Sequence, residues 1–287
     1  MIFLQNELLK ISVLDPLTDQ KRFGSRYCTG GYIWQVYDKI AEENLLSGPA
    51  YPSPDPPVFD GQGLPEVFET AICSNTASVG DEVLVIGVGT VLRRSPVSPF
   101  HVRDNPDVVS FCKWDTDVQV NKVTMKTSQD FKGHSLDLIR EIYLDKRTLT
   151  SQTTIHNKGE LPFQLRWFAH PFFPHPEDGV CCNFSLPVNV PENPGFFLNV
   201  NGYLEMKREH QWEKGCYRPL ELPWGERMII RQRHKTVSEI QIKLGFPLAW
   251  MPVWGNRVTF SFEPYYETEL KPLSSDNSAN WHITYVF

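Results

Sequence analysis

Short segments in which apolar and polar residues alternate recur along most of this 287-residue chain, and they constrain its fold more than any other feature. Residues 239–244 read Glu-Ile-Gln-Ile-Lys-Leu, which is the two-residue period of a strand with one buried and one polar side. No long amphipathic helix interrupts the series. Because regularly spaced short strands separated by turn residues are typical of sandwiches and barrels, the sequence predicts an all-β fold built as a large antiparallel β-sandwich or barrel.

The expected strands follow a short opening strand and a glycine-punctuated turn that feeds the aromatic segment ending at residue 38. They are 82–92, 108–114, 118–127, 136–144, 148–156, 163–170, 196–206, 227–233, 240–246, 258–263 and 281–287. Residues 157–160, Asn-Lys-Gly-Glu, are expected to form a hairpin turn between two of these strands, since Asn and Gly tolerate the positive φ that tight turns need.

Two of the expected strands end in the same way, with an ionisable residue followed by proline. In residues 163–170, one face carries apolar side chains and the other carries Gln164, Arg166, Phe168 and His170. In residues 258–263, the polar row ends at Glu263. Proline has no N–H for a sheet ladder, so each strand must stop there. An imidazole and a carboxylate can form an acid–base couple, and His170 and Glu263 are therefore the predicted catalytic pair.

Residues 47–65 are rich in proline and glycine, which makes regular structure improbable there. A loop of this length could link two domains, but long loops in compact folds also often form the rim of a binding site. The strands on both sides look alike, which favours the rim. We therefore expect residues 1–287 to form a single β-sandwich domain.

Composition excludes several classes of function. The formal net charge of −6 and the pI near 5.8 show no excess of Lys and Arg for a phosphate backbone, so nucleic acid is not an expected partner. No segment has the length of apolar sequence that spans a bilayer, and the first residues do not resemble a signal peptide. The six cysteines form no CxxC pair. We expect a cytoplasmic protein without a membrane partner.

Several segments carry a resemblance to a known family. Residues 149–163 read Leu-Thr-Ser-Gln-Thr-Thr-Ile-His-Asn-Lys-Gly-Glu-Leu-Pro-Phe and lead into His170-Pro171-Phe172-Phe173, while Glu263-Pro264 lies late in the chain. This arrangement resembles the aldose 1-epimerase, or galactose mutarotase-like, family, in its divergent bacterial branch. Residues 61–68 and 86–92 stand where relatives have a loop at the rim of the site and the strand that follows it. The resemblance covers most of the chain.

The resemblance implies a β-supersandwich whose concave face holds a hexose, and an isomerase that interconverts the α and β anomers of this monosaccharide. Glu263 would remove the proton of the C1 hydroxyl while His170 protonates the ring oxygen, with the two groups on opposite sides of the sugar. No cofactor and no metal would be required. We expect a monomer or a weak dimer, and we expect substitution of either residue to remove activity without unfolding the protein.

Further substrate-binding residues are assigned on weaker grounds. Arg26 is the candidate for the family's sugar-binding arginine, and Glu66 is a possible hydroxyl acceptor. Arg166 shares the face of His170 and could bind a hydroxyl or a phosphate, or pair with a neighbouring carboxylate. Trp250 could form a wall for the apolar face of a sugar, or could simply pack at the rim. The family's second active-site histidine has no match in residues 61–68.

Two other functions remain open. A carbohydrate-binding protein could keep the fold and the groove without turnover, and the unassigned second histidine favours this alternative. A polysaccharide lyase or a glycosidase-related domain could also use the same sandwich, because a fold does not fix function. A glycosidase needs two facing carboxylates, and the sequence singles out only Glu263.

Overall fold

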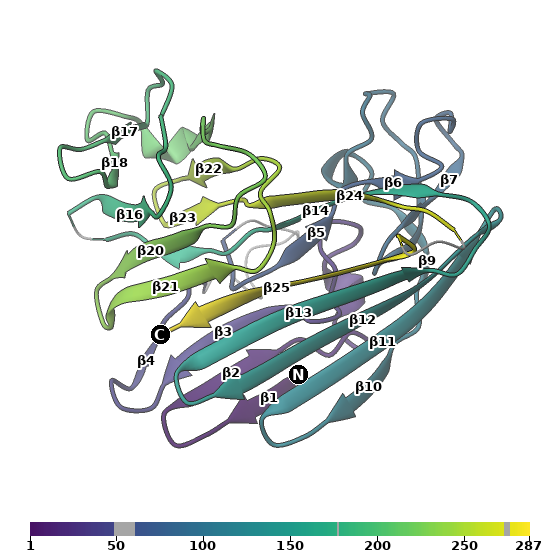
Figure 1. The fold of residues 1–287 in the computed structure, drawn as a ribbon, viewed down its shortest axis with the longest axis horizontal. Helices are drawn as coiled ribbons and strands as arrows, with labels where there is room; N and C mark the ends of the chain where they lie inside the picture. Colours follow the sequence, from purple (N-terminus) through teal and green to yellow (C-terminus); the bar gives the residue numbers. More distant parts are fainter. Residues whose placement is uncertain (49–60, 177, 273–275) are drawn as a thin grey trace.

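The protein is described by a computed structural model that covers residues 1–48, 61–176, 178–272 and 276–287. Its largest element is a ten-stranded sheet in which all neighbours are antiparallel (Figure 1). In spatial order the strands are β10 (Asp115–Val118), β11 (Lys122–Phe131), β12 (His134–Asp145), β13 (Thr148–Asn157), β25 (Ser278–Val286), β21 (Ser238–Leu244), β20 (Ile229–His234), β16 (Val180–Phe184), β18 (Leu204–Met206) and β17 (Phe196–Leu198). The late strand β25 therefore joins two groups of strands that are far apart in sequence.

Four smaller sheets complete the fold, in the spatial orders β1-β2-β3-β4, β24-β14-β5, β15-β23-β22-β19 and β6-β7-β8-β9. Their strands are β1 (Ile2–Gln5), β2 (Leu9–Val13), β3 (Ile33–Asp38), β4 (Glu43–Asn44), β5 (Glu66–Phe68), β6 (Ala71–Ile72), β7 (Glu82–Val85), β8 (Gly89–Leu92), β9 (Val108–Phe111), β14 (Phe163–Ala169), β15 (Phe173–Pro174), β19 (Cys216–Pro219), β22 (Pro252–Gly255), β23 (Thr259–Phe262) and β24 (Tyr265–Leu270). The helical turns are the 3₁₀ segments η1 (Gln20–Arg22), η2 (Val102–Asp104) and η3 (Trp212–Lys214). In the ranges that the structure covers, no helix has both the length and the apolar character to cross a membrane.

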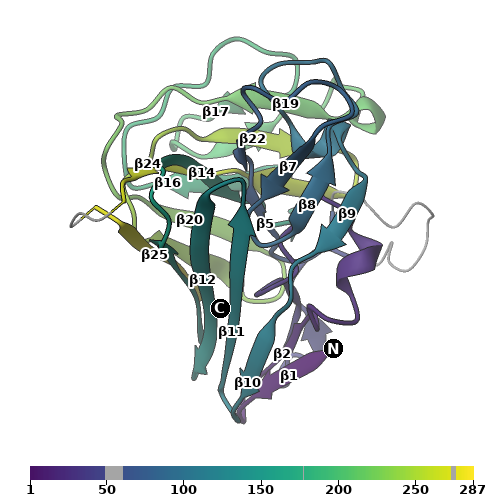
Figure 2. The same ribbon diagram turned by 90° about the vertical axis from the view of Figure 1, so that its right-hand side faces the viewer.

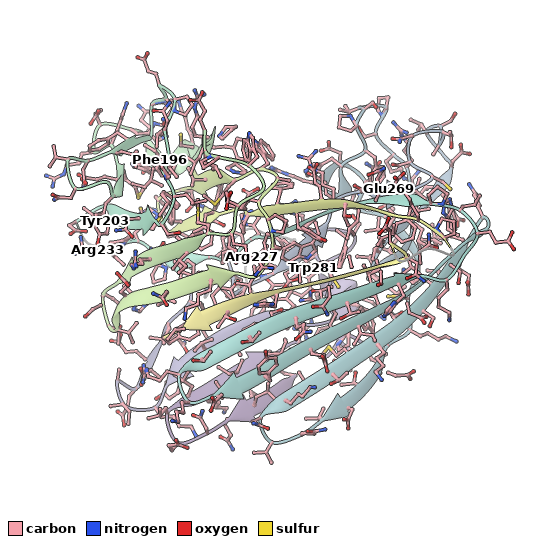
Figure 3. The ribbon with its side chains drawn as sticks, viewed as in Figure 1. Phe196, Tyr203, Arg227, Arg233, Glu269 and Trp281 are labelled. Carbon is pink, nitrogen blue, oxygen red and sulfur yellow. The ribbon has the colours of Figure 1, made fainter. Side chains whose placement is uncertain are left out.

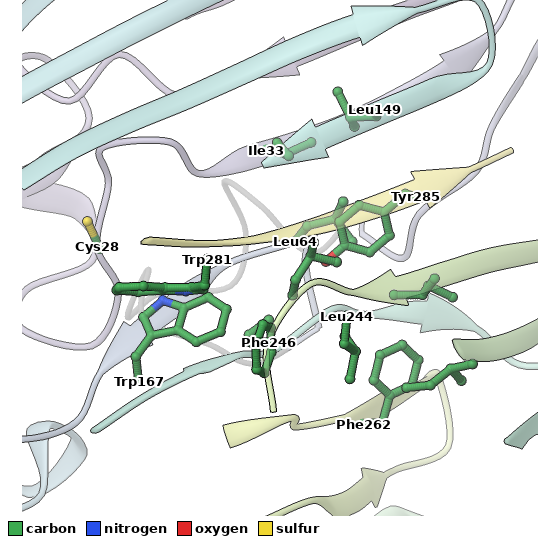
Figure 4. Packing of buried hydrophobic residues seen from close by; sticks show 14 of the residues in the cluster. Cys28, Ile33, Leu64, Leu149, Trp167, Leu244, Phe246, Phe262, Trp281 and Tyr285 are labelled. Carbon is green, nitrogen blue, oxygen red and sulfur yellow. The ribbon is translucent and has the colours of Figure 1, made fainter. Parts of the chain in front are cut away.

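The layers pack through the alternating faces of their strands. Strands β10–β12 face the sheet of β1 and β2 across the interior (Figure 2). Alternate residues of β11, β12 and β2 point inward because the side-chain period of a strand is two, whereas all four residues of β10 are exposed. The larger apolar cluster includes Trp167, whose ring centroid lies 5.3 Å from that of Trp281 and 5.5 Å from that of Phe246 (Figure 4). Edge-on aromatic contacts of this kind fill much of the space between the layers.

Strand β14 lies between β24 and β5. One face of β14 is directed to this core and its other face is directed away from it. Its Phe163, Leu165, Trp167 and Ala169 belong to the larger cluster, whereas Gln164 is exposed and Arg166 is half-buried. The predicted alternation of this strand is confirmed, and so is the all-β antiparallel fold.

Three expectations about local structure are wrong. Residues 157–160 do not close a hairpin: β13 pairs with β12 and β25, and β14 pairs with β24 and β5, so this turn leads from one sheet to another. The expected strand 82–92 is a hairpin of β7 and β8 that turns at Gly87, where φ is +73°. The expected strand 196–206 is likewise the hairpin of β17 and β18.

Of the two strands that end at proline, the second differs from the expected pattern at one position. Phe260 and Phe262 are fully buried, but Val258 precedes β23 and is 63% exposed. The interpretation of residues 47–65 as the rim of the site depends on residues 49–60, which lie outside the described part of the chain.

Candidate active site

His170 follows the last residue of β14 and is almost completely buried. Its N–H donates to the carbonyl of Pro65, 2.9 Å away, which ties the end of β14 to the residue before β5. Its ring stacks on Phe172 with the centroids 4.3 Å apart, and it makes an edge-on contact with Trp254 with the centroids 6.1 Å apart. These contacts fix the plane of the imidazole ring.

The tautomer of His170 follows from its contact with Ser261. The imidazole Nδ1 lies 2.7 Å from Ser261 Oγ, and this hydroxyl in turn donates to the carbonyl of Phe262 at 3.4 Å. A hydroxyl has a single proton to donate, so Ser261 Oγ accepts from Nδ1–H. The other ring nitrogen, Nε2, is then directed to Glu263.

Glu263 follows the last residue of β23, and its N–H donates to the carbonyl of Pro252 at 2.9 Å. Its Oε1 lies 3.5 Å from Nε2 of His170, with side-chain exposures of 8% and 3%, respectively. The structure therefore brings together the two residues that the sequence paired. They lie side by side, not on opposite sides of a ligand as the sequence analysis expected.

A cavity of about 600 Å³ opens beside this pair. Glu263 lines it, together with three of the predicted binding residues, Arg26, Arg166 and Trp250. His170 is not among the described residues that line the cavity, and its link to the cavity is its contact with Glu263. A carboxylate at the wall with an imidazole beside it can exchange protons with a bound hydroxyl group.

One wall of the cavity is aromatic. Tyr265 stacks on Phe168 with the ring centroids 4.5 Å apart and an interplanar angle of 19°. Trp250 lies 4.8 Å from Tyr265, and the Arg166 guanidinium lies over both of these rings, at 5.4 Å and 4.8 Å. Burial raises the pKa values of the Tyr217 and Tyr265 phenols, which therefore stay protonated and can donate hydrogen bonds.

Arg166 is held by carboxylates, which was one of the two alternatives that the sequence left open. Its Nε lies 2.9 Å from Glu69 Oε2 and 3.1 Å from Glu267 Oε1. Because Arg166 also lines the cavity, the ion pairs fix the guanidinium at the wall without removing it from a ligand's reach.

Glu69 and His101 also line the cavity, and sequence reasoning missed both. His101 Nε2 lies 3.6 Å from Glu69 Oε1, and its Nδ1 accepts from the Arg103 N–H at 3.1 Å, so the proton of the neutral ring is on Nε2. Burial raises the pKa of the Glu69 carboxyl despite the nearby Arg166.

Of the two predicted binding residues Arg26 and Glu66, only Arg26 lines the cavity in the described part of the chain. Arg26 is only 7% exposed, lines the cavity and lies 5.1 Å from the Tyr27 ring. Glu66 points the other way, into the core: Oε2 lies 2.5 Å from Arg140 Nη1, and Oε1 accepts from the Ser151 hydroxyl at 2.7 Å. The expected role of Glu66 as a hydroxyl acceptor is therefore a misassignment, because both of its oxygens are bonded to buried groups.

The comparisons with known proteins concern the fold. No protein-family model matches the sequence, and no curated protein matches it. Among solved structures, a galactose mutarotase related enzyme from Lactobacillus acidophilus has a TM-score of 0.63 at 11% identity, covering 99% of this chain and 96% of that chain. A galactose mutarotase-like protein from Lactobacillus casei has a TM-score of 0.56 at 13% identity, covering 100% and 99%.

A third match is an aldose epimerase homologue from C. elegans, with a TM-score of 0.54 at 11% identity and coverage of 99% and 97%. The chain therefore has the galactose mutarotase-like fold over nearly its whole length, as the resemblance implied. At these identities the likeness concerns the fold alone.

Proposed function

We propose that the protein is an aldose 1-epimerase-type isomerase that interconverts the α and β anomers of a hexose by ring opening and reclosure. The observation that carries this proposal is the contact between His170 and Glu263 beside the 600 Å³ cavity that Glu263 lines. In a pyranose, the hydroxyl oxygen and the ring oxygen are bonded to the same carbon, C1. A base and an acid that act on these two oxygens therefore belong side by side, which is the arrangement of Glu263 and His170.

The reaction starts from ionised Glu263 and protonated His170. Glu263 takes the proton of the C1 hydroxyl, the electron pair of that O–H bond forms the C1 carbonyl, the bond from C1 to the ring oxygen breaks, and His170 Nε2–H protonates that oxygen. Because His170 does not itself line the cavity, this step requires the Glu263 carboxylate to turn away from Nε2 as the sugar binds. The products of this step are the open-chain aldehyde, a neutral imidazole and a protonated carboxyl. After rotation about C1–C2, the hydroxyl formed from the ring oxygen attacks the other face of C1. Its proton returns to His170, and Glu263 protonates the carbonyl oxygen of C1.

The remaining groups at the wall would hold the sugar for this step. The stacked rings of Phe168 and Tyr265, with Trp250 beside them, offer a flat apolar surface for the C–H face of a pyranose. Arg26 and Arg166 supply donors for the sugar's oxygens, whereas the Tyr265 hydroxyl, which donates to Glu69 Oε1 at 3.4 Å, can accept from a sugar hydroxyl.

Polarimetry with freshly dissolved α-glucose and α-galactose tests the proposal. The protein should bring the rotation to its equilibrium value much faster than buffer does. If a sugar binds but the rotation changes at the buffer rate, the protein is a carbohydrate-binding protein and not an epimerase.

A glycosidase-related activity is the second candidate, because Glu69 and Glu263 line the same cavity and burial raises the pKa of Glu69. Glycoside hydrolysis uses two carboxyl groups in one cavity, of which one has a raised pKa. Release of nitrophenol from aryl glycosides, lost in both Glu69→Gln and Glu263→Gln, would favour this candidate over the epimerase.

A further inference from the structure

A second recess adjoins the candidate site. It has a volume of about 330 Å³ and shares Thr70, Ser74 and Asn75 with the 600 Å³ cavity. Its far side is lined by His134, Gln164 and Glu269. The two recesses therefore meet along one segment of chain, residues 70–75.

The ribbon of β14 and β24 runs along both recesses. Its pairs in register are Phe168 with Tyr265, Arg166 with Glu267, and Gln164 with Glu269. Because these are alternate residues of each strand, all six side chains lie on the same face of the ribbon. The first pair lines the larger cavity and the last lines the smaller recess. Phe168 is four positions along the strand from Gln164, a length of about 13 Å. Figure 1 shows β22 and β23 near the start of β24. Figure 3 shows Glu269 at the opposite end of β24.

The chemistry of the smaller recess fits uncharged hydroxyl groups. Its lining offers the hydroxyls of Thr70, Ser74 and Thr76, the amides of Asn75 and Gln164, and the carboxylate of Glu269. In the described part of the chain, no lysine or arginine lines it, so it has no cation for a phosphate. Gln164 is exposed and its amide makes no hydrogen bond to any described residue, which leaves its donors and acceptor for a ligand.

We propose that the site takes the reducing end of a di- or oligosaccharide, with the reducing ring in the larger cavity beside Glu263 and the next ring in the recess of Gln164 and Glu269. This inference rests on the proposed epimerase function for the role of the first ring. It adds that the substrate is longer than a single hexose. Cavities of roughly 300–1,000 Å³ enclose ligands of drug size, and the two recesses together offer such a ligand a continuous surface.

Anomer exchange measured by NMR on glucose, maltose, cellobiose and lactose tests the proposal, since each of these sugars has a reducing glucose. At least one disaccharide should have a kcat/KM on the order of tenfold above that of glucose, equivalent to ~1.4 kcal/mol. Gln164→Ala and Glu269→Ala should each reduce this ratio by roughly three- to tenfold. Gln5→Ala at an exposed position on β1 and Glu239→Ala at a half-buried position on β21 are controls on other sheets and should keep the ratio of the parent.

The outcomes separate this inference from the proposed function. Equal kcat/KM for glucose and all three disaccharides, unaltered by Gln164→Ala, would overturn the second subsite and leave the epimerase intact. No anomer exchange on any sugar, with disaccharide binding that Gln164→Ala weakens in calorimetry, would overturn the epimerase and support the subsite. Cleavage of a disaccharide into monosaccharides would overturn the proposed orientation, because the glycosidic bond and not a free C1 would lie beside Glu263.

Cys73 provides a readout that does not depend on catalysis. It lines the smaller recess and is half-buried, and Cys112 is a half-buried free thiol that lines neither recess in the described part of the chain. The disaccharide that is preferred in kinetics should slow alkylation of Cys73, as located by peptide mass spectrometry, more than glucose does. Alkylation of Cys112 should not respond. Equal protection of Cys73 by glucose and by the disaccharide would contradict the proposal.

Discussion

His170 and Glu263 are in contact in the structure, with Nε2 3.5 Å from Oε1, although 92 residues lie between them in the sequence. Each residue comes directly after a strand and directly before a proline, and each has its backbone N–H bonded to the carbonyl of another proline, Pro65 or Pro252. The side chains are thus placed by fixed backbone on both sides.

Replacement of either member of this pair should abolish most of the activity. His170→Asn and Glu263→Gln should each lower kcat for anomer exchange by about 10²- to 10⁴-fold, the usual contribution of a positioned acid or base. The double variant should be little worse than the single ones, because the two groups act in one step. Polarimetry measures the rates, and Glu239→Gln serves as a control. Collapsed thermal melts of both variants would assign these residues to stability instead.

Ser261 should act as a positioning residue for His170. Ser261→Ala removes the acceptor of Nδ1–H and should lower kcat on the order of tenfold while changing KM less, because the imidazole loses its orientation but the cavity wall stays. Thr259→Val is the matched control: Thr259 is buried on the same face of β23 and bonds to Ser47 and Phe173, not to His170. If both variants lower kcat equally, Ser261 has only a structural role.

Glu66→Gln should destabilise the protein by about 3–5 kcal/mol, because it leaves the buried Arg140 guanidinium without a counter-charge. Urea denaturation measures the loss. Glu239→Gln removes a partner of Arg231 whose side chain is 40% exposed and should cost no more than about 1 kcal/mol. A similar small cost for Glu66→Gln would show that the network around Arg140 relaxes to accommodate the charge.

His234 should make stability depend on pH. Burial lowers its pKa below the ordinary value of 6.5, and its Nδ1 accepts the N–H groups of Thr236 and Val237. As pH falls below 6.5 the unfolded chain takes up the proton first, so this contribution to stability is present above that pH and is lost toward the lower folded-state pKa. His234→Gln should therefore show a smaller loss of unfolding free energy between about pH 7 and pH 5. An unchanged loss in the variant would contradict this role.

The sequence was sufficient for the fold class and for singling out His170 and Glu263, which the structure places in contact, because both predictions depend on local signals. Alternation over several residues reports which face of β14 is buried, and a proline reports where a strand must end. These signals held even though no family model matches the chain.

Glu66 and Glu69 show where such signals fail. Glu66 is the first residue of the three-residue strand β5 and Glu69 follows its last, and within this strand Phe68 faces the larger apolar cluster and Val67 faces the smaller one. Since both faces of β5 are buried, alternation cannot tell which side holds the cavity, and the sequence analysis chose the wrong glutamate. The sequence shows that Val67 and Glu69, two residues apart, lie on the same face of an extended segment. Which face holds the cavity depends on the pairing of β5 with β14.

His101, Tyr217 and Tyr265 were missed as site residues for a related reason. They come from a 3₁₀ turn boundary and two other sheets, and only long-range pairing brings them to one cavity. The same limit explains the turn at residues 157–160, whose Asn and Gly permit a hairpin but do not decide which strands pair.

The central place of β25 has a consequence for biosynthesis. Until Ser278–Val286 has emerged from the ribosome, β13 and β21 have no partner on their facing edges, and the two groups of strands in the ten-stranded sheet stay separate. Nascent chains that lack this segment expose two unpaired edges that can recruit one another, so we expect translation arrest shortly before residue 278 to yield aggregates bound by chaperones.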